Sequence, residues 1–143
     1  MTDEDQIREM YALWAERDAD KDAEGWSQLY TEDGKFISGR RIEYVGRAAI
    51  RKNLEDRTAA SPPDRHTMHI FGTPFIRVDG DHAESRSAYV AYGRAGNGPW
   101  EVMTIGRFHT RLVRANDGWL FTEVDNRAIG TPTGLVAPPP PAQ

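Results

Sequence analysis

The chain has 143 residues and carries 18 Lys and Arg against 22 Asp and Glu, which gives a formal net charge of −4. This length is that of one ordinary domain, and the acidic balance argues against nucleic acid as a partner, because phosphate binding needs a basic surface. The absence of cysteine excludes disulfides, thiolate zinc sites and a cysteine nucleophile. The sequence contains no apolar run long enough to span a membrane, and its acidic start lacks the features of a signal peptide, so we expect a cytoplasmic protein.

The first part of the chain shows helical periodicity. Apolar residues recur there at the spacing of one helical face, which Thr2 or Asp3 can cap. That face consists of Ile7, Met10, Tyr11, Trp14 and Asp18. The segments that follow are predicted as a short helix over Ala23–Tyr30, a turn at 32–34, a short strand over Lys35–Ser38 and a helix over Gly46–Arg57.

The second part of the chain changes to the period of two that is typical of strands. Asp-Gly pairs between the apolar runs indicate tight hairpin turns. The predicted strands cover residues 66–78, 83–92, 101–114 and 119–127, with turns at 79–81, 93–99 and 116–118. Three helices followed by a four-stranded antiparallel meander predict an α+β domain with the helices on one face of the sheet.

The C-terminal segment differs in composition from the rest of the chain. Residues 130–143 contain no charged residue and five prolines, and Pro138–Pro141 can form only an extended, polyproline-like chain. We therefore expect one domain over residues 1–129 and a Pro-rich tail over residues 130–143. This tail is either a disordered terminus or an arm that crosses a neighbouring subunit or closes a cavity.

Four sequence pieces, in this order and spacing, resemble the SnoaL-like branch of the nuclear-transport-factor-2-like (NTF2-like) superfamily over residues 5–127. They are Tyr11 with the acidic patch ERDADKDAEGW, then LYTEDGKF, then RHTMHIFGTPFIRVDGDHAES, then GRFHTRLVRANDGWLF. The resemblance implies a cone, in which a curved antiparallel sheet wraps around three helices and leaves a deep apolar cavity. Members of this superfamily include dehydratases and other lyases, steroid isomerases, polyketide cyclases, epoxide hydrolases and domains without known catalysis.

The resemblance also implies a general base. In the lyases of this group a histidine on the first long strand, ten residues before an Asp-Gly turn, takes the proton, and the matching position here is His69, counted back from Asp79. Thr73 stands where relatives often have asparagine. Histidine suits this role because its unperturbed pKa lies close to neutral pH.

An aspartate at the end of the first helix orients the base in those lyases. Counting back from Trp26 and Tyr30 places this position on Ala19, which lies between Asp18 and Asp20. Helical periodicity favours Asp18, because it extends the buried face of the helix, whereas Asp20 falls at the exposed end. Both aspartates therefore remain candidates as the partner of His69.

Several residues should point to the concave face of the sheet by strand or helix periodicity. Each is a candidate for binding the substrate, with simple core packing as the alternative. They are Trp14, Phe36, Phe71, Tyr89, Thr104 and Phe108. Gly106 would leave room beside Phe108, and Arg127 could polarise a substrate oxygen. Met103 and Ile105 share the opposite, convex face with two arginines, which predicts a homodimer or small homo-oligomer through that face.

These features predict a cofactor-free enzyme of the proton-transfer type, a dehydratase, isomerase or related lyase, acting on a small apolar or aromatic, oxygenated molecule. A non-catalytic ligand-binding domain, and a polyketide cyclase or epoxide hydrolase that uses the same cavity, are the alternatives. We expect no metal and no organic cofactor. His66 and His69 cannot bind one metal together, because they point to opposite sides of one strand. The weak exception to the absence of a metal is an iron-type site formed by His82, Glu84 and His109.

Overall fold

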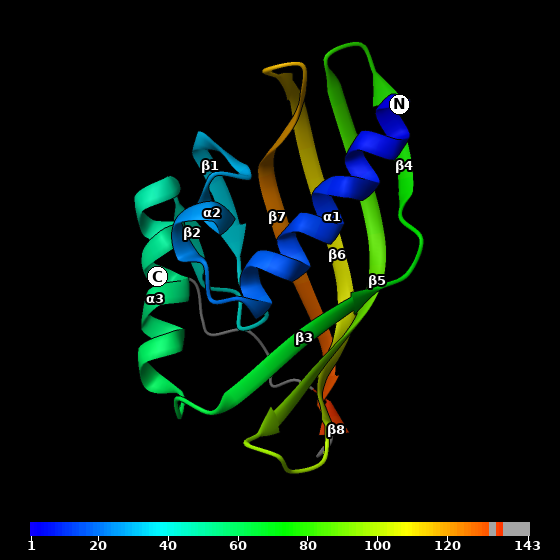
Figure 1. The fold of residues 1–143 in the computed structure, drawn as a ribbon. Coiled ribbons are helices and arrows are strands. Elements are labelled where there is room, and N and C mark those ends of the chain that lie inside the picture. The colour runs from blue at the N-terminus through cyan, green and yellow to red at the C-terminus, as the bar shows by residue number, and fades with distance from the viewer. Residues whose placement is uncertain (132–133, 136–143) are drawn as a thin grey trace.

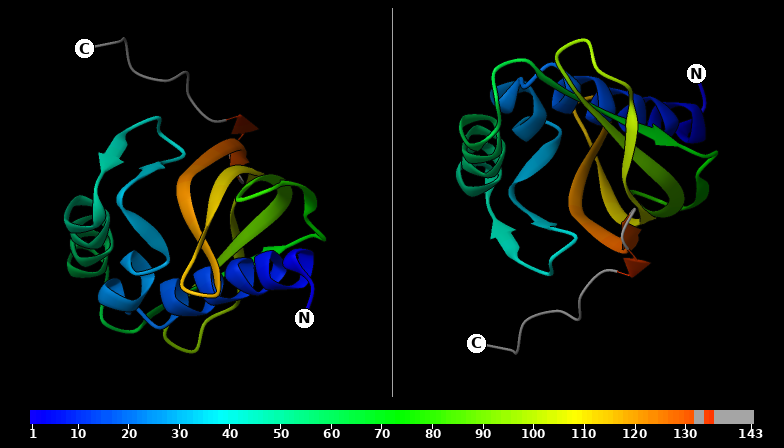
Figure 2. Two further views of the ribbon diagram at one scale, coloured as in Figure 1. Left: turned by 90° about the horizontal axis from the view of Figure 1, so that it is seen from above. Right: turned by 90° about the horizontal axis from the view of Figure 1, so that it is seen from below.

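Three helices and one curved sheet make up the computed structural model, which describes residues 1–131 and 134–135. The helices lie on the concave side of the sheet, and α1 crosses the face formed by the long strands β5, β6 and β7 (Figure 1, Figure 2). In chain order the elements are α1 (Asp3–Ala19), α2 (Ala23–Ser27), β1 (Tyr30–Ile37), β2 (Glu43–Val45), α3 (Arg47–Ala60), β3 (Arg65–Phe71), β4 (Phe75–Asp79), β5 (His82–Ala95), β6 (Glu101–Ala115), β7 (Gly118–Thr131) and β8 (Gly134–Leu135).

The strands follow the order β2-β1-β7-β6-β5-β3, with β4 beside β5 and β8 beside β7. All pairs are antiparallel except β1 with β7, which run parallel. A curved sheet that wraps around helices on one side is the α+β cone that the sequence predicts, so the predicted fold class is confirmed.

Helix α1 begins and ends on identifiable signals. Thr2 caps its start, and its side chain accepts a hydrogen bond from the amide of Asp5. At the other end Lys21 adopts the left-handed conformation, with φ of 59°, and the amides of Lys21 and Asp22 donate to the carbonyls of Asp18 and Arg17. This is the Schellman pattern, which places Asp18 in the last turn of the helix. The predicted buried face of α1, from Ile7 to Asp18, is confirmed.

The segment after α2 is a strand where the sequence predicts a helix end and a turn. Helix α2 ends at Ser27, and Tyr30 opens β1 fully buried, opposite Phe121 of β7. The expected turn at residues 32–34 is an irregular part of β1, where the pairing register shifts. A parallel pairing between strands so far apart in the chain leaves no local signal, which is why the prediction of helix to Tyr30 is wrong.

The predicted single strand over residues 66–78 is two strands that both pair with β5. The break at Gly72 and Pro74 shifts the alternation by one residue. Thr73 is therefore exposed in the connection and Phe75 is 52% exposed, whereas Ile76 packs against the core. The predicted four-stranded meander is wrong for this reason and because β1 joins the sheet.

A second irregularity, between β5 and β6, reverses one predicted side chain. The register shifts where Ala91 pairs with Thr104 and Tyr92 pairs with Val102, so Met103 is an extra residue. Met103 consequently packs against the core and against Gly93, whereas Ile105 stays 44% exposed on the outer face. The expectation that Met103 lies on the convex face is therefore wrong.

The hydrophobic core fills the space between α1 and the sheet. It includes Trp26 and Trp119, which the sequence predicts as core residues. None of the helices in the described part of the chain is both long and apolar enough to cross a membrane. Of the predicted tail, residues 130–131 continue β7 and residues 134–135 form β8, while Pro138–Pro141 lie outside the described residues.

Candidate functional site

His69 and Asp18 meet at the end of α1. The inward face of β3 carries Arg65, Thr67, His69 and Phe71, because alternate residues of a strand share a face. The last turn of α1 packs against this strand and turns Asp18 toward it. The distance from His69 Nδ1 to Asp18 Oδ1 is 3.6 Å, so the structure brings together the two residues that the sequence pairs.

Burial dominates the electrostatics of this pair. The side chain of Asp18 is 1% exposed and that of His69 is 14% exposed. Removal from water lowers the pKa of His69; the Asp18 carboxylate opposes this shift and the Arg57 guanidinium adds to it. The imidazole is therefore neutral at neutral pH, the form that accepts a proton. Its Nδ1 has no hydrogen-bond partner among the described residues, and the approach to Asp18 is slightly too long for one.

Arg57 is a third member of the site that the sequence does not reveal. This residue lies in the last turn of α3, and its Nη2 donates to Asp18 Oδ2 over 3.1 Å. Its Nε donates to Asn53 Oδ1, and its guanidinium lies over the ring of Trp26 at 5.6 Å. The carboxylate of Asp18 therefore has Arg57 on one oxygen and His69 facing the other.

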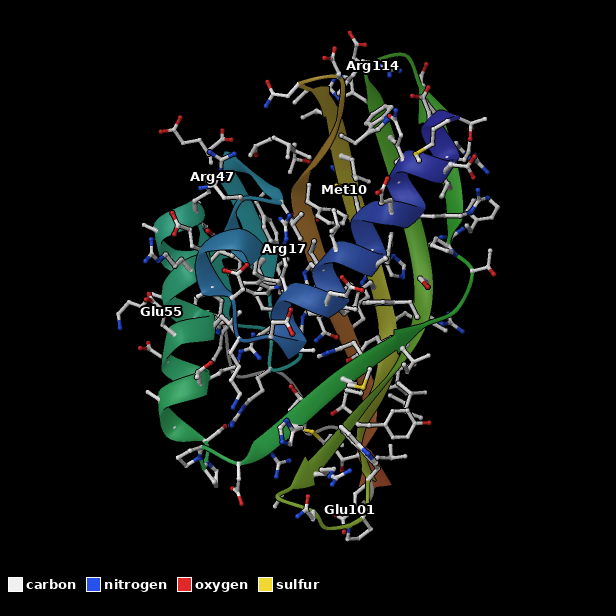
Figure 3. All side chains as sticks on the ribbon, viewed as in Figure 1. Met10, Arg17, Arg47, Glu55, Glu101 and Arg114 are labelled. Carbon is white, nitrogen blue, oxygen red and sulfur yellow. The ribbon has the colours of Figure 1, made fainter. Side chains whose placement is uncertain are left out.

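Two further contacts fix the elements around the site. Arg17 Nη1 donates to the carbonyl of Gly25 over 2.8 Å, which ties the last turn of α1 to α2. Arg47 Nε donates to the carbonyl of Tyr30 over 2.9 Å, which ties α3 to β1. Figure 3 shows both arginines between the elements that they join. These contacts hold α1 and α3 in the positions from which Asp18 and Arg57 meet.

Aromatic rings surround His69 on the concave side of the sheet. The ring of Trp14 meets that of His69 edge to face, with centroids 4.9 Å apart, and Phe71 and Tyr89 lie at 6.3 and 5.8 Å. Phe108 contacts Trp14, Phe71 and Tyr89 at 4.8 to 5.0 Å. The aromatic residues among the predicted lining thus form one cluster around the histidine, and Phe36 joins it through Trp14 at 6.3 Å.

A second polar group lies in this apolar surrounding. The hydroxyl of Tyr89 donates to Asn126 Oδ1 over 2.6 Å, and burial raises the pKa of Tyr89 to about 12. The phenol is therefore protonated at neutral pH, and Asn126 Oδ1 accepts its one proton. The sequence predicts Tyr89 as a lining residue but gives no signal for Asn126, because only the pairing of β5, β6 and β7 brings the two strands together.

The other predicted residues lie farther from the pair or on other faces. Asp20 caps α1, is exposed, and lines a separate surface cavity together with His69. Thr104 is half-buried opposite Ala91. Arg127 lies on the outer face, where it binds Asp125, so the expectation that it reaches a substrate inside the cone is wrong. In the part of the chain that the structure describes, no group of three His, Asp or Glu side chains could hold a metal.

The fold and this arrangement define an NTF2-like protein of the cone type. A family model for the SnoaL-like domain matches residues 1–125, and the chain therefore belongs to the SnoaL-like family. Members of this family include polyketide cyclases and dehydratases, which is consistent with an enzyme. No curated protein matches the sequence closely enough to count as a relative.

Solved structures with the same fold come from several bacteria. An NTF2-like protein from Novosphingobium aromaticivorans is 27% identical, with a TM-score of 0.77 over 87% of this chain and 80% of its own. Rv3472 from Mycobacterium tuberculosis, of unknown function, is 25% identical, with a TM-score of 0.77 over 90% of this chain and 72% of its own. A scytalone dehydratase-like protein from Novosphingobium aromaticivorans is 23% identical, with a TM-score of 0.79 over 100% of this chain and 99% of its own, and this likeness shows the fold alone.

Proposed function

We propose that the protein is a cofactor-free general acid–base enzyme, a dehydratase, isomerase or related lyase, that acts on a small aromatic or apolar, oxygenated molecule. The observation that carries this proposal is the approach of His69 Nδ1 to the buried carboxylate of Asp18 within an aromatic cluster. A neutral imidazole in apolar surroundings, with a carboxylate on its other side, is the arrangement that general-base catalysis needs.

In this reaction His69 takes a proton from the substrate through Nε2. In the neutral imidazole the proton is on Nδ1, facing Asp18 Oδ1, and when Nε2 takes the second proton the carboxylate stabilises the imidazolium that forms. The Tyr89 hydroxyl would donate a hydrogen bond to a substrate oxygen that gains negative charge, by exchanging its acceptor Asn126 Oδ1 for that oxygen. A substrate ring would separate the packed rings of the cluster beside Trp14 and Phe108, which are 2% and 1% exposed.

The alternative function is ligand binding without catalysis. The aromatic cluster alone is sufficient for that role, and it does not require the pair of His69 and Asp18. The two functions differ in what these polar residues do: replacing them abolishes turnover in the first case and changes only affinity in the second.

The test is turnover of hydroxylated aromatic candidates, including any ligand that co-purifies with the protein, followed by mass spectrometry. We expect His69→Ala to abolish turnover and Asp18→Asn to lower the rate by about 10²- to 10⁴-fold, the usual contribution of positioned acid–base groups. Both variants should keep the far-ultraviolet circular dichroism spectrum of the parent.

Asp20→Asn is the matched control, because Asp20 lies two residues away in an exposed position. It should turn over substrate at the parent rate. A large loss in Asp20→Asn with none in Asp18→Asn would show that Asp20 is the partner of the base. Parent activity in His69→Ala would refute the proposed mechanism.

A further inference from the structure

Three cationic side chains surround a small cavity beside Asp18. Lys21 comes from the end of α1, Arg57 from the last turn of α3 and Arg65 from the start of β3. With Asp18 they line a cavity of about 40 Å³. The rest of the lining consists of Leu54, Thr58, Ser61 and Thr67. A cavity of this size has room for a carboxylate group.

The charges around this cavity are not balanced. Asp18 is the only carboxylate in the lining, and Arg57 already binds it. Neither Lys21 nor Arg65 forms an ion pair with a carboxylate within residues 1–131, and the one side-chain hydrogen bond of Arg65 there runs from Nη2 to the sulfur of Met103, at 3.4 Å. Two positive charges therefore lack a partner here, in a chain whose net charge is −4.

The cavity lies beside the proposed base, because Asp18 lines it and also faces His69. Thr67 lies between Arg65 and His69 on the inward face of β3, and alternate residues on a strand are about 6.6 Å apart. A ligand with one end between the cations and its body along this face would reach the imidazole of His69 within the length of an aromatic acid. Asp18 therefore connects the cations to the proposed base, although His69 itself does not line the cavity.

We propose that Lys21, Arg57 and Arg65 bind the carboxylate, or a similarly compact oxyanion, of an aromatic substrate, and that this anion draws Arg57 away from Asp18. The binding half of this inference stands on the cavity and its charges alone. The second half rests on the proposed function, because it concerns the partner of the base.

The second half follows from the competition for Asp18. Arg57 lies 3.1 Å from one carboxylate oxygen, and His69 lies 3.6 Å from the other, so without a ligand the carboxylate is bound to Arg57. A substrate anion offers Arg57 a second partner and leaves Asp18 to His69. The base would then gain its orienting partner only when an anionic substrate is present.

Several charged or titratable groups face His69 and must be considered in any test of its protonation. From α1 these are Asp18, and Glu16 and Asp20 across the neighbouring surface cavity. Arg57 comes from α3 and Tyr89 from β5. Among them Arg57 is the cation, so its withdrawal and the approach of Asp18 both favour the protonated imidazole, as does the negative charge of the ligand itself.

The binding test compares 2-naphthoate and benzoate with their uncharged amides, by calorimetry on the full chain. We expect the acids to bind about tenfold more tightly than the amides, because charge-assisted hydrogen bonds are roughly twice as strong as neutral ones. Arg65→Gln and Lys21→Asn should each reduce this preference. Asparagine suits position 21 because it tolerates the left-handed backbone there.

Arg51→Gln is the matched control, since Arg51 lies on the exposed side of the same helix as Arg57 and pairs only with Glu55. It should leave the preference unchanged. No measurable binding of either acid, no preference over the amides, or a preference that survives both Arg65→Gln and Lys21→Asn would overturn the inference. Circular dichroism of each variant establishes that it is folded.

The coupling test follows the His69 imidazole by NMR. Saturating 2-naphthoate should raise the pKa of His69, and the rise should be smaller in Arg57→Gln, where no guanidinium is left to be drawn away. An equal rise in both proteins would overturn the release of Asp18. Binding at equilibrium needs no turnover, so a failed acid preference is distinguishable from parent activity in His69→Ala, which refutes the proposed catalysis instead.

Discussion

At the scale of single residues, His69 links the proposed chemistry to stability. Its pKa in the folded protein lies below the ordinary value of 6.5, chiefly because the imidazole is removed from water. The unfolded chain has no such restriction and takes up a proton at higher pH. As the pH falls below about 6.5, protons therefore bind the unfolded state first and the folded state loses stability.

We expect the free energy of unfolding to fall between about pH 7.5 and pH 5.5, and to fall less steeply in His69→Gln than in the parent. Urea titrations at several pH values give both slopes. His66→Gln is the control, because His66 is exposed on the other side of the same strand and should leave the slope as it is. Identical slopes in the parent and in His69→Gln would contradict the assignment of this proton to His69.

At the scale of elements, a buried group of hydroxyls joins α1 to the sheet. The hydroxyl of Tyr11 lies 2.6 Å from Ser85 Oγ on β5 and 3.3 Å from Thr110 Oγ1 on β6. Ser85 and Thr110 are themselves 2.5 Å apart. Burial raises the pKa of Tyr11, as expected for a phenol kept neutral inside the core. Each of the three hydroxyls therefore has a hydrogen-bond partner within the group, and none is left unpaired in the core.

Tyr11→Phe should lower the free energy of unfolding by about 1 kcal/mol, since it removes the hydrogen bonds of one hydroxyl and leaves Ser85 and Thr110 bonded to each other. Tyr44→Phe is the matched control. The Tyr44 ring stacks on Phe36, but its hydroxyl makes no hydrogen bond within the described ranges, so we expect a change within about 0.5 kcal/mol. Urea-induced unfolding measures both, and equal effects would show that the hydroxyl group on Tyr11 adds nothing specific.

Elements that depend on local periodicity could be predicted from the sequence, and those that depend on distant pairing could not. The face of α1 and the turn at residues 116–118 carry their own signals, and Asn116 and Asp117 adopt the positive φ values that the turn needs. The start of β1 at Tyr30 depends on β7, some ninety residues away in the chain. No local pattern records such a contact.

The same division applies to the site. Asp18 could be placed by helical periodicity and His69 by the resemblance, because each belongs to a pattern in its own segment. In the sequence Arg57 is one more exposed arginine of α3, and only the packing of α3 against α2 and β1 brings it to Asp18. Sequence analysis could therefore pair His69 with Asp18, but it could not identify a side chain that comes from a third element, α3.

At the scale of the whole molecule, the outer face of the sheet carries an apolar patch. Its members lie side by side across three strands, because Ile70 of β3 pairs with Val90 of β5, which pairs with Ile105 of β6. Ile70 and Ile105 are 52% and 44% exposed. Met68 and Val102 extend the patch through Tyr92 in the next row and are 45% and 39% exposed. Contiguous apolar surface of this kind marks a contact with another molecule.

We propose that this patch is where two copies of the chain associate, as the sequence predicts for the convex face, although through Ile105 and β3 rather than through Met103. Analytical sedimentation at a protein concentration of about tens of micromolar, at which stable complexes are associated, should show a dimer or small oligomer. Ile70→Lys and Ile105→Lys should each shift the protein toward monomer, because a lysine at the centre of an apolar contact loses hydration without gaining a partner. Val45→Lys, at a position 62% exposed on β2 and away from the patch, should sediment as the parent does. A parent that is monomeric at this concentration would show that the outer face serves another purpose, whereas dimers in both patch variants would move the interface elsewhere on the surface.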